Sequence, residues 1–225
     1  MRPVTLIRLA AAATVVVLVL FAVGRIERRG ILPGERGPAG PSSGENGAGP
    51  DAREIQAARE ALPPGGLPLV AVPGAFTDAA GRVRRLSELR GEPFLASVLY
   101  TRCPTVCPRV IAELNRLERS AEEGLPTRFV LFSLDPAHDT PEVLRAFAEV
   151  HALNPETWTL LTPEPGALEP LTRALGVASG PDAAGGIAHS AVIAVVDGEG
   201  RVRRRHVGLG SPAAALAAEL RASAR

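Results

Sequence analysis

The sequence contains no lysine, because all 25 of its basic residues are arginine. This absence excludes mechanisms that need a lysine, among them Schiff-base catalysis and phosphate binding by a P-loop. Cysteine is scarce as well, since Cys103 and Cys107 are the only two. Two cysteines exclude the disulfide framework of a small secreted fold, but they leave open a local redox or metal-binding pair. The net charge of +1 gives no electrostatic footprint for nucleic acid, so we expect no nucleic-acid partner.

The chain has the apolar and charged content of a globular protein. Apolar residues make up 46% and charged residues 22% of its 225 positions, and these shares exclude wholesale disorder. The length provides for one ordinary domain with appendages or for two small domains.

Residues 1–29 are expected to form an N-terminal membrane anchor. An uncharged run covers Leu9–Gly24, and arginines stand on both sides of it. With the apolar residues before the run, and with Arg8 extending its charged end to the interface, the segment is long enough to span a bilayer. A cleaved signal peptide, with Ala22 and Gly24 at the cleavage site, is the competing interpretation. We favour the uncleaved anchor, and both interpretations imply export of the rest of the chain.

Residues 30–66 are expected to form a flexible linker. They are dense in glycine, proline and serine, and they have too few large apolar residues to form a core. Residues 67–225 alternate strand and helix signals, and we expect them to form one domain.

The strongest signals in this domain are two apolar runs, Phe94–Tyr100 and Phe129–Leu134, which have the length of buried strands. A strand, a helix and a second strand in this order predict a parallel, right-handed βαβ unit. The Cys103 and Cys107 pair lies where the first strand passes into its helix, which is the thioredoxin-like arrangement. We therefore predict an α/β fold with a thioredoxin-like mixed sheet flanked by helices.

Capping and turn residues predict further elements. Asp139, shortly before a proline, is typical of a helix start, and we expect its carboxylate to cap that helix. The arginines at Arg201 and Arg203–Arg205 are expected to form a solvated edge that discourages strand pairing. The remaining predicted elements are a β-ribbon of Leu69–Phe76 and Arg82–Val83, an extended segment at Trp158–Leu161, a helix at Leu168–Leu175 closed by Gly176, a hairpin of Ser190–Val196 and Arg201–Val207, and a helix at Pro212–Ala224.

Cys103 and Cys107 are the candidate reactive residues. A helix N-terminus offers unpaired N–H groups and the positive end of the helix dipole, and both favour the thiolate over the thiol. Because a thiolate is a nucleophile and a metal ligand, the pair suits redox chemistry or metal binding. A plain stabilising disulfide is the alternative; it would close a very short loop and contribute about 2 kcal/mol or less.

A soft metal held by two cysteines needs a third ligand, and His189 is the candidate. It precedes an apolar strand whose entrance lies against the cysteine loop in a thioredoxin-like layout. Two thiolates and an imidazole suit copper, since soft sulfur selects Cu(I) and a Cys₂His set also tolerates Cu(II). An ordinary hydrogen-bonded histidine is the alternative. Of the other histidines, His138 is a candidate auxiliary ligand, whereas His151 is expected at the surface and His206 in solvent.

Several short motifs follow one another along the predicted domain. They are Tyr100-Thr101-Arg102-Cys103-Pro104 with Cys107-Pro108, Ser133-Leu134-Asp135-Pro136, Asp139-Thr140-Pro141, Trp158 with Leu160-Leu161-Thr162, and His189-Ser190. In their order and spacing, from about Leu67 to Val207, they resemble the Sco/SenC family of copper-binding proteins, which take part in assembling the copper centre of respiratory oxidase. The combination is specific, although each motif alone is not. The anchor and the linker also resemble that family's organisation.

The resemblance implies a function and a site. Cys103, Cys107 and His189 take the roles of the three copper ligands, for Cu(I), Cu(II) or both. The chain is then a bacterial copper chaperone, anchored to the membrane with its domain on the extracytoplasmic (periplasmic) side. Its implied partner is the copper-bearing subunit of cytochrome oxidase, with other copper chaperones or thiol reductases as further candidates. Asp135 is a candidate for orienting a ligand or meeting a partner near the metal.

A thiol–disulfide oxidoreductase that reduces the cysteines of the oxidase copper site is the alternative function. Such enzymes usually place a cis-proline before the strand that faces their cysteines, whereas the segment Gly186–Ser190 has no proline and carries His189. This difference favours metal binding over disulfide exchange. A thiol peroxidase is disfavoured because those enzymes need a single activated cysteine in a different motif. We therefore expect a metallochaperone rather than an enzyme.

Overall fold

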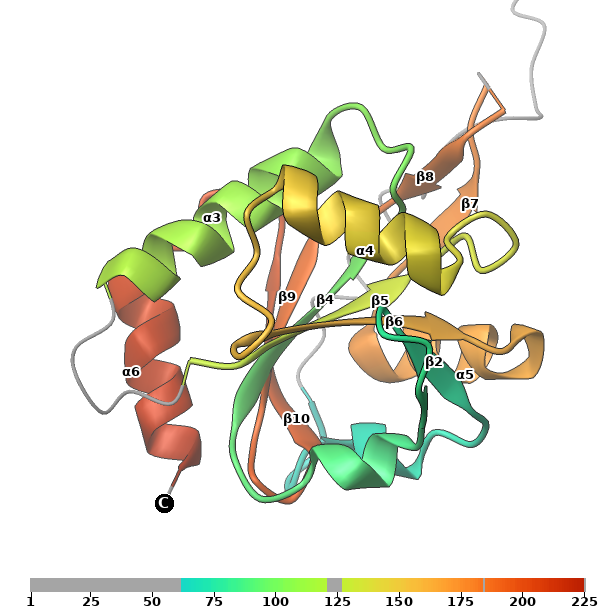
Figure 1. Cartoon of the computed structure of the whole chain (residues 1–225). Coiled ribbons are helices and arrows are strands. Elements are labelled where there is room, and N and C mark those ends of the chain that lie inside the picture. Colours follow the sequence, from blue (N-terminus) through green and yellow to red (C-terminus); the bar gives the residue numbers. More distant parts are fainter. Residues whose placement is uncertain (1–61, 121–126, 184, 225) are drawn as a thin grey trace, which may run out of the picture. The chain divides into compact units, whose positions relative to one another are not determined.

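The computed structural model describes residues 62–120, 127–183 and 185–224 (Figure 1). The predicted anchor at residues 1–29, and the predicted linker up to residue 61, lie outside these described residues. Among the helices of the described ranges, none has the length and apolar character that crossing a bilayer requires.

A central sheet contains β1 (Leu67–Pro68), β2 (Phe76–Asp78), β3 (Val83–Arg84), β4 (Phe94–Leu99), β5 (Phe129–Ser133), β6 (Trp158–Pro163), β9 (Val192–Val196) and β10 (Arg201–Val207). The strand order is β1-β10-β9-β4-β5-β6-β2-β3. The β4–β5 and β5–β6 pairs are parallel, and the other neighbours are antiparallel. The predicted mixed sheet, with its parallel βαβ start, is therefore confirmed.

The helices that flank the sheet are α3 (Val106–Ser120), α4 (Pro141–Val150), α5 (Leu168–Leu175) and α6 (Ala213–Ser223), with short 3-10 helices η1 (Leu69–Ala71), η2 (Leu86–Leu89) and η3 (Pro165–Ala167). Both α3 and α4 connect neighbouring parallel strands, and right-handed crossovers of this kind place the two helices on one face of the sheet. Figure 1 shows them there together. Helix α6 packs against α3, and α5 contacts β10. The predicted α/β class is confirmed.

The strands β4, β5 and β9 are buried along their whole length. A sheet covered by helices leaves no solvated face, which explains why these strands are continuous apolar runs rather than alternating patterns. The core continues beyond β4 into Tyr100, Cys103 and Cys107. The cysteine loop is therefore built directly on the hydrophobic core.

Helix α4 begins with a different cap from the predicted one. Thr140 is the N-cap residue, and its side chain accepts a hydrogen bond from the Val143 amide. Pro141 is the first helical residue, so the threonine directly before it occupies the cap position. Asp139 is wholly buried and hydrogen-bonds to Ser133 at the end of β5. The prediction that Asp139 caps this helix is wrong.

The segment before β2 also differs from the prediction. Leu69–Ala71 form the 3-10 helix η1, where a strand was predicted. Pro68 and Pro73 stand on either side of this segment, and a proline provides no N–H group for a strand ladder. Leu69 is fully buried, so the segment still packs into the core.

The arginine-rich strand β10 is less exposed than predicted. On its outer side β1 pairs with it, Leu67 opposite Val202, so this part of β10 is not an open edge. Arg205 is half-buried and donates a hydrogen bond to the Ala174 carbonyl at the end of α5 (2.9 Å). That arginine therefore stabilises the C-terminus of a helix, where a cation is favourable.

A separate two-stranded sheet consists of β7 (Ser179–Pro181) and β8 (Ile187–His189). Ser179 pairs with His189. Beyond this pair, the Ser190 amide donates to the Ala178 carbonyl (2.9 Å), and the Ser190 hydroxyl accepts from the Ala178 amide (3.1 Å). These bonds fix the backbone on both sides of the His189 side chain.

Two carboxylates hold α3 against its neighbours. Glu113 is buried and accepts hydrogen bonds from the amides of Gly210 and Ser211, directly before α6. Glu118 accepts a hydrogen bond from the indole N–H of Trp158 on β6 (2.9 Å). The position of α3 is therefore fixed both to α6 and to the sheet.

Replacement of Glu113 by alanine is expected to lower the free energy of unfolding by about 1–3 kcal/mol, because two partly buried amides lose their acceptor. The measurement is urea unfolding of the full-length chain, followed by the fluorescence of Trp158, the single tryptophan. Arg116→Ala, at an exposed position of the same helix, is the control and should change stability by no more than about 0.5 kcal/mol. Equal losses in both variants would contradict the assigned role of Glu113.

Candidate metal centre

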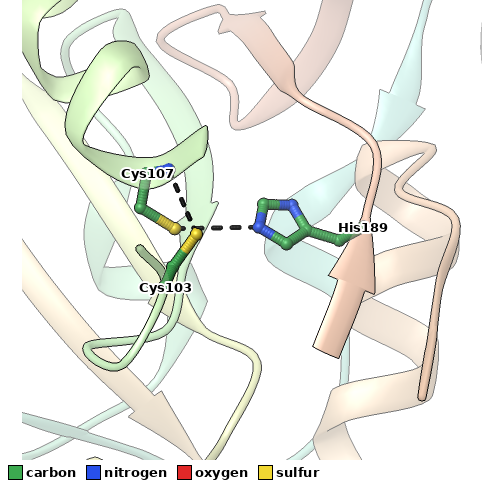
Figure 2. Close-up of side chains that lie close together, drawn as sticks. All are labelled: Cys103, Cys107 and His189. Atoms are coloured by element: carbon green, nitrogen blue, oxygen red, sulfur yellow. Dashed lines mark hydrogen bonds between the residues drawn. The ribbon is translucent and has the colours of Figure 1, made fainter. Parts of the chain in front are cut away.

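The loop that joins β4 to α3 places the sulfur of Cys103 at a helix N-terminus. The Cys103 amide donates a hydrogen bond to the Tyr100 carbonyl (3.0 Å). The Cys103 sulfur in turn accepts a hydrogen bond from the amide of Cys107 (3.4 Å), as Figure 2 shows. Cys107 is the second residue of α3, so this amide is one of the free N–H groups that stabilise negative charge.

The two sulfurs differ in their affinity for a proton. The pKa of Cys103 is lowered to about 4, mainly because the Cys107 thiol donates a hydrogen bond to its thiolate; burial opposes this effect, and the Cys107 and Thr105 amides add to it. The pKa of Cys107 is raised, first because it gives that hydrogen bond and second because it is almost wholly buried. At neutral pH the pair is therefore one thiolate and one thiol.

His189 faces these sulfurs from β8. Its Nε2 atom lies 3.7 Å from the Sγ atom of Cys107 (Figure 2). Its Nδ1 atom lies 3.1 Å from the Ser190 carbonyl oxygen, which can only accept a hydrogen bond, so we assign the proton of the neutral ring to Nδ1. Nε2 then turns its lone pair toward the sulfurs, which is the form and orientation of a metal-binding histidine.

Cys103, Cys107 and His189 offer one donor atom each, and these three atoms lie within 4.8 Å of one another. Two sulfurs and one imidazole nitrogen are soft to intermediate donors, which suit copper and do not suit calcium or magnesium. A structural zinc site takes four such ligands, and no fourth histidine, cysteine or carboxylate of the described residues joins this group. The donor set therefore fits copper.

Asp139, the buried carboxylate that the sequence predicted to be a helix cap, supports the cysteine loop. Asp139 accepts hydrogen bonds from the hydroxyls of Thr101 and Ser133, each at 2.6 Å. Thr101 belongs to the cysteine loop and Ser133 ends β5, so Asp139 joins these two segments. The sequence does contain a signal for this joining role. Asp139 closely follows the second parallel strand, β5, and the end of β5 lies beside the loop that follows the first parallel strand, β4.

Asp135 does not contact the three candidate ligands in the described structure. Its carboxylate pairs with the guanidinium of Arg102, the residue before Cys103, at 2.6 Å. Asp135 therefore links the cysteine loop to the loop after β5 through an ion pair, and it does so near the solvent, since the Arg102 side chain is 58% exposed.

The remaining histidines lie apart from the three candidate ligands. His138 contacts Asp139 (3.1 Å) and forms a cluster with it and Asp135, but both carboxylates already have partners. His151 follows α4 and is half-buried, which lowers its pKa. His206 was expected in solvent, but its Nε2 lies 2.7 Å from Glu219 on α6.

Comparison with known proteins gives a consistent family. The sequence model of the SCO1/SenC family matches residues 69–225. The chain is 34% identical over 91 residues to the SCO1 protein homolog of Bacillus subtilis (strain 168), a match that covers 40% of this chain and 47% of that relative. The chain thus spans about half the length of that curated relative.

Two solved structures are similar over most of their length. A SCO1/SenC family lipoprotein from Bacillus anthracis is 29% identical with a TM-score of 0.60, and the match covers 67% of this chain and 92% of that one. Bradyrhizobium japonicum ScoI with copper bound is 26% identical with a TM-score of 0.54, and the match covers 68% and 98%. Both support the described α/β fold.

Because only Cys103 is a thiolate at neutral pH, iodoacetamide is expected to label Cys103 and to leave Cys107 largely unmodified. The labelling rate should stay level from pH 8 to pH 5 and fall as the pH drops below the Cys103 pKa of about 4. Mass spectrometry of the reduced, metal-free chain after timed labelling provides the measurement. The control is Cys103→Ser, which should remove nearly all labelling; preferential modification of Cys107 would contradict the assignment.

Proposed function

Because the chain belongs to the SCO1/SenC family, we propose that it is a copper chaperone that binds one copper ion through Cys103, Cys107 and His189. The observation that carries this proposal is the convergence of their three donor atoms within 4.8 Å. The related Bradyrhizobium japonicum ScoI, whose structure has copper bound, supports the choice of metal. The cargo is delivered for assembly of the copper centre of respiratory cytochrome oxidase; the structurally similar BsSco is a member of the Sco family of cytochrome c oxidase assembly proteins.

Copper loading requires both sulfurs to be deprotonated. Cys103 is already a thiolate at neutral pH, since its pKa is about 4, so loading displaces the proton of Cys107. Two thiolates and a neutral imidazole give a net charge of −1 with Cu(I) and 0 with Cu(II). The site therefore suits both oxidation states without a large uncompensated charge.

The proposed domain organisation places this site outside the cytoplasm. Residues 1–29 anchor the chain in a bacterial membrane, and residues 30–66 tether the domain of residues 67–225 on the periplasmic side. The uncharged run with arginines on both sides supports the anchor, and the glycine- and proline-rich composition supports the tether.

Three candidate partners follow from this location. The copper-bearing subunit of cytochrome oxidase receives the cargo. Because the periplasm favours disulfides, the Cys103 and Cys107 pair needs a thiol reductase to keep it able to bind metal. Another copper chaperone is the third candidate partner, as the source of the ion.

The alternative function, a thiol–disulfide oxidoreductase for the oxidase copper site, is favoured by one specific observation. The pKa of Cys103 is lowered and the pKa of Cys107 is raised. In thiol–disulfide exchange these are the properties of an attacking thiolate and of a resolving thiol, respectively. In this reaction Cys103 attacks a target disulfide. Cys107 then displaces the reduced target, and the pair itself becomes oxidised.

Reduced protein is expected to bind one copper ion per chain, whereas protein with a Cys103–Cys107 disulfide should bind none, because a metal ligand must be a free, deprotonated sulfur. Metal analysis after gel filtration of the full-length chain, loaded with Cu(I) or Cu(II), measures the stoichiometry. Equal copper contents in the reduced and oxidised samples would refute the ligand assignment.

His189→Ala separates the two functions. It removes the nitrogen ligand, so Cu(II) affinity should fall by more than the roughly 10–100-fold typical of changes to groups around a metal ligand, and the sulfur-to-copper absorption should be lost. Cu(I) binding should persist, since two thiolates can hold Cu(I). Titration with absorption spectroscopy measures both.

Cells carrying the same variant provide the functional readout. A chaperone without His189 should fail to support oxidase assembly, whereas a reductase should retain most of its function. His138→Ala is the matched control, since it removes an imidazole outside the donor group and should leave Cu(II) binding intact. Normal oxidase assembly together with abolished Cu(II) binding in His189→Ala would favour the reductase.

A further inference from the structure

A pocket of about 630 Å³ lies between α5, the start of β7 and β10, and this volume is typical of ligand pockets. Leu168 and Val177 give it apolar walls, whereas Arg205 and Ser179 bring hydrogen-bonding groups. The described residues that line this pocket include none of the three candidate metal ligands. The pocket is therefore separate from the candidate metal centre.

Arg205 brings a positive charge to this pocket without a matching anion. Its neighbours on β10, Arg201, Arg203 and Arg204, each have a carboxylate at 3.5–3.8 Å. Arg205 takes part in none of the ion pairs between described residues, and its Nε atom is buried with no acceptor among them. Burial accordingly lowers the pKa of Arg205, because the cation has lost hydration without gaining an anion.

The guanidinium of Arg205 is held in a fixed position. Its Nη2 atom donates to the Ala174 carbonyl (2.9 Å). It also lies over Gly176, where the Cβ atom of any other residue would stand 2.7 Å from the guanidinium carbon. The two other charged residues that line the pocket, Glu169 and Arg173, pair with each other. The pocket therefore has one preorganised cation to offer to a ligand.

The strand β7 brings an open edge to the same pocket. The Ser190 amide donates to the Ala178 carbonyl, and the Asp182 amide donates to the Gly186 carbonyl. Hydrogen-bonded positions alternate along an antiparallel ladder, so the N–H and C=O groups of Ser179 point away from β8. Among the described strands, β8 is the single neighbour of β7. An open edge of this kind can pair with an added strand.

We propose that this pocket is a docking site for an extended, acidic peptide segment of a partner protein. The backbone of the segment pairs with the open edge of β7 at Ser179, and one of its carboxylate side chains binds the guanidinium of Arg205. A small anion could satisfy Arg205 but would leave the Ser179 edge unpaired, so the two features together favour a peptide. Because Ser179 pairs with His189 across the hairpin, the docked segment becomes a third strand beside a candidate copper ligand.

The probe is a fluorescently labelled peptide, Thr-Val-Glu-Val-Thr with blocked ends, which favours an extended conformation around one carboxylate. Fluorescence anisotropy, with the full-length, metal-free chain as titrant, should show saturable binding. A twin peptide with glutamine in place of glutamate should bind about tenfold more weakly, the scale of one hydrogen bond to a charged group. A second twin, methylated on both valine nitrogens, keeps the carboxylate but cannot pair as a strand, and its affinity should fall by a similar factor.

Arg205→Gln should weaken binding of the glutamate peptide as much as the glutamine twin does, because it removes the same contact from the other side. Arg204→Gln is the matched control. Arg204 lies on the same strand, but its guanidinium pairs with Glu219 on α6, away from this pocket. Its loss changes the net charge equally and should leave the affinity unchanged. Equal losses in the two variants would reflect net charge alone and would overturn the inference.

The remaining outcomes are equally decisive. The inference is overturned if the wild type shows no saturable binding of the glutamate peptide, or if it binds either twin as tightly. Displacement of the peptide by an equal concentration of sodium acetate would show a site for small anions and would overturn it too. If Arg205→Gln does not fold, the three peptides on the wild type still decide. The experiment uses no copper, so its failure leaves the proposed function standing.

Discussion

The candidate metal centre depends on the hydrogen bonds that the sulfur of Cys103 accepts at the start of α3. They come from the Cys107 thiol and from backbone amides, and they keep one sulfur ionised although Cys103 is only 9% exposed. An unpaired charge there would be costly. The helix N-terminus removes that cost before any metal arrives, so the site needs little reorganisation to accept an ion.

The rest of the fold keeps that helix end in place. Glu113 fastens α3 to the segment before α6, and Glu118 fastens it to β6. Asp139 holds the cysteine loop to the end of β5 through two hydroxyls. All three are buried or half-buried carboxylates that accept hydrogen bonds from neighbouring segments. In the described residues, carboxylate oxygens thus hold the segments around the candidate site together, whereas the candidate metal donors are sulfur and nitrogen atoms.

The sequence was sufficient to predict the parts of the fold that depend on local patterns. Such parts are the apolar strands β4 and β5, the helix α5 that ends at Gly176, and the cysteine pair between a strand and a helix. Asp139 was misinterpreted because an acid before Thr140-Pro141 has the pattern of a helix cap whether or not it is buried. The pairing of Ser179 with His189 and the edge-on contact of the Tyr100 ring with the His189 imidazole join distant segments, and no local pattern encodes such contacts. The predicted thioredoxin-like layout and the motif resemblance, rather than periodicity, connected His189 to the cysteines.

The three donors belong to two differently supported parts of the structure. Both cysteines continue from the main sheet into α3, whereas His189 is carried by the β7–β8 hairpin, which shares no pairing with the eight-stranded sheet. Withdrawal of the imidazole therefore breaks no ladder hydrogen bond of the main sheet. Under the proposed chaperone function, an incoming ligand from another protein can take the place of this one candidate donor while both sulfurs still hold the ion. Under the same proposal, transfer proceeds by exchanging one ligand at a time, and the ion never has to pass free through solvent.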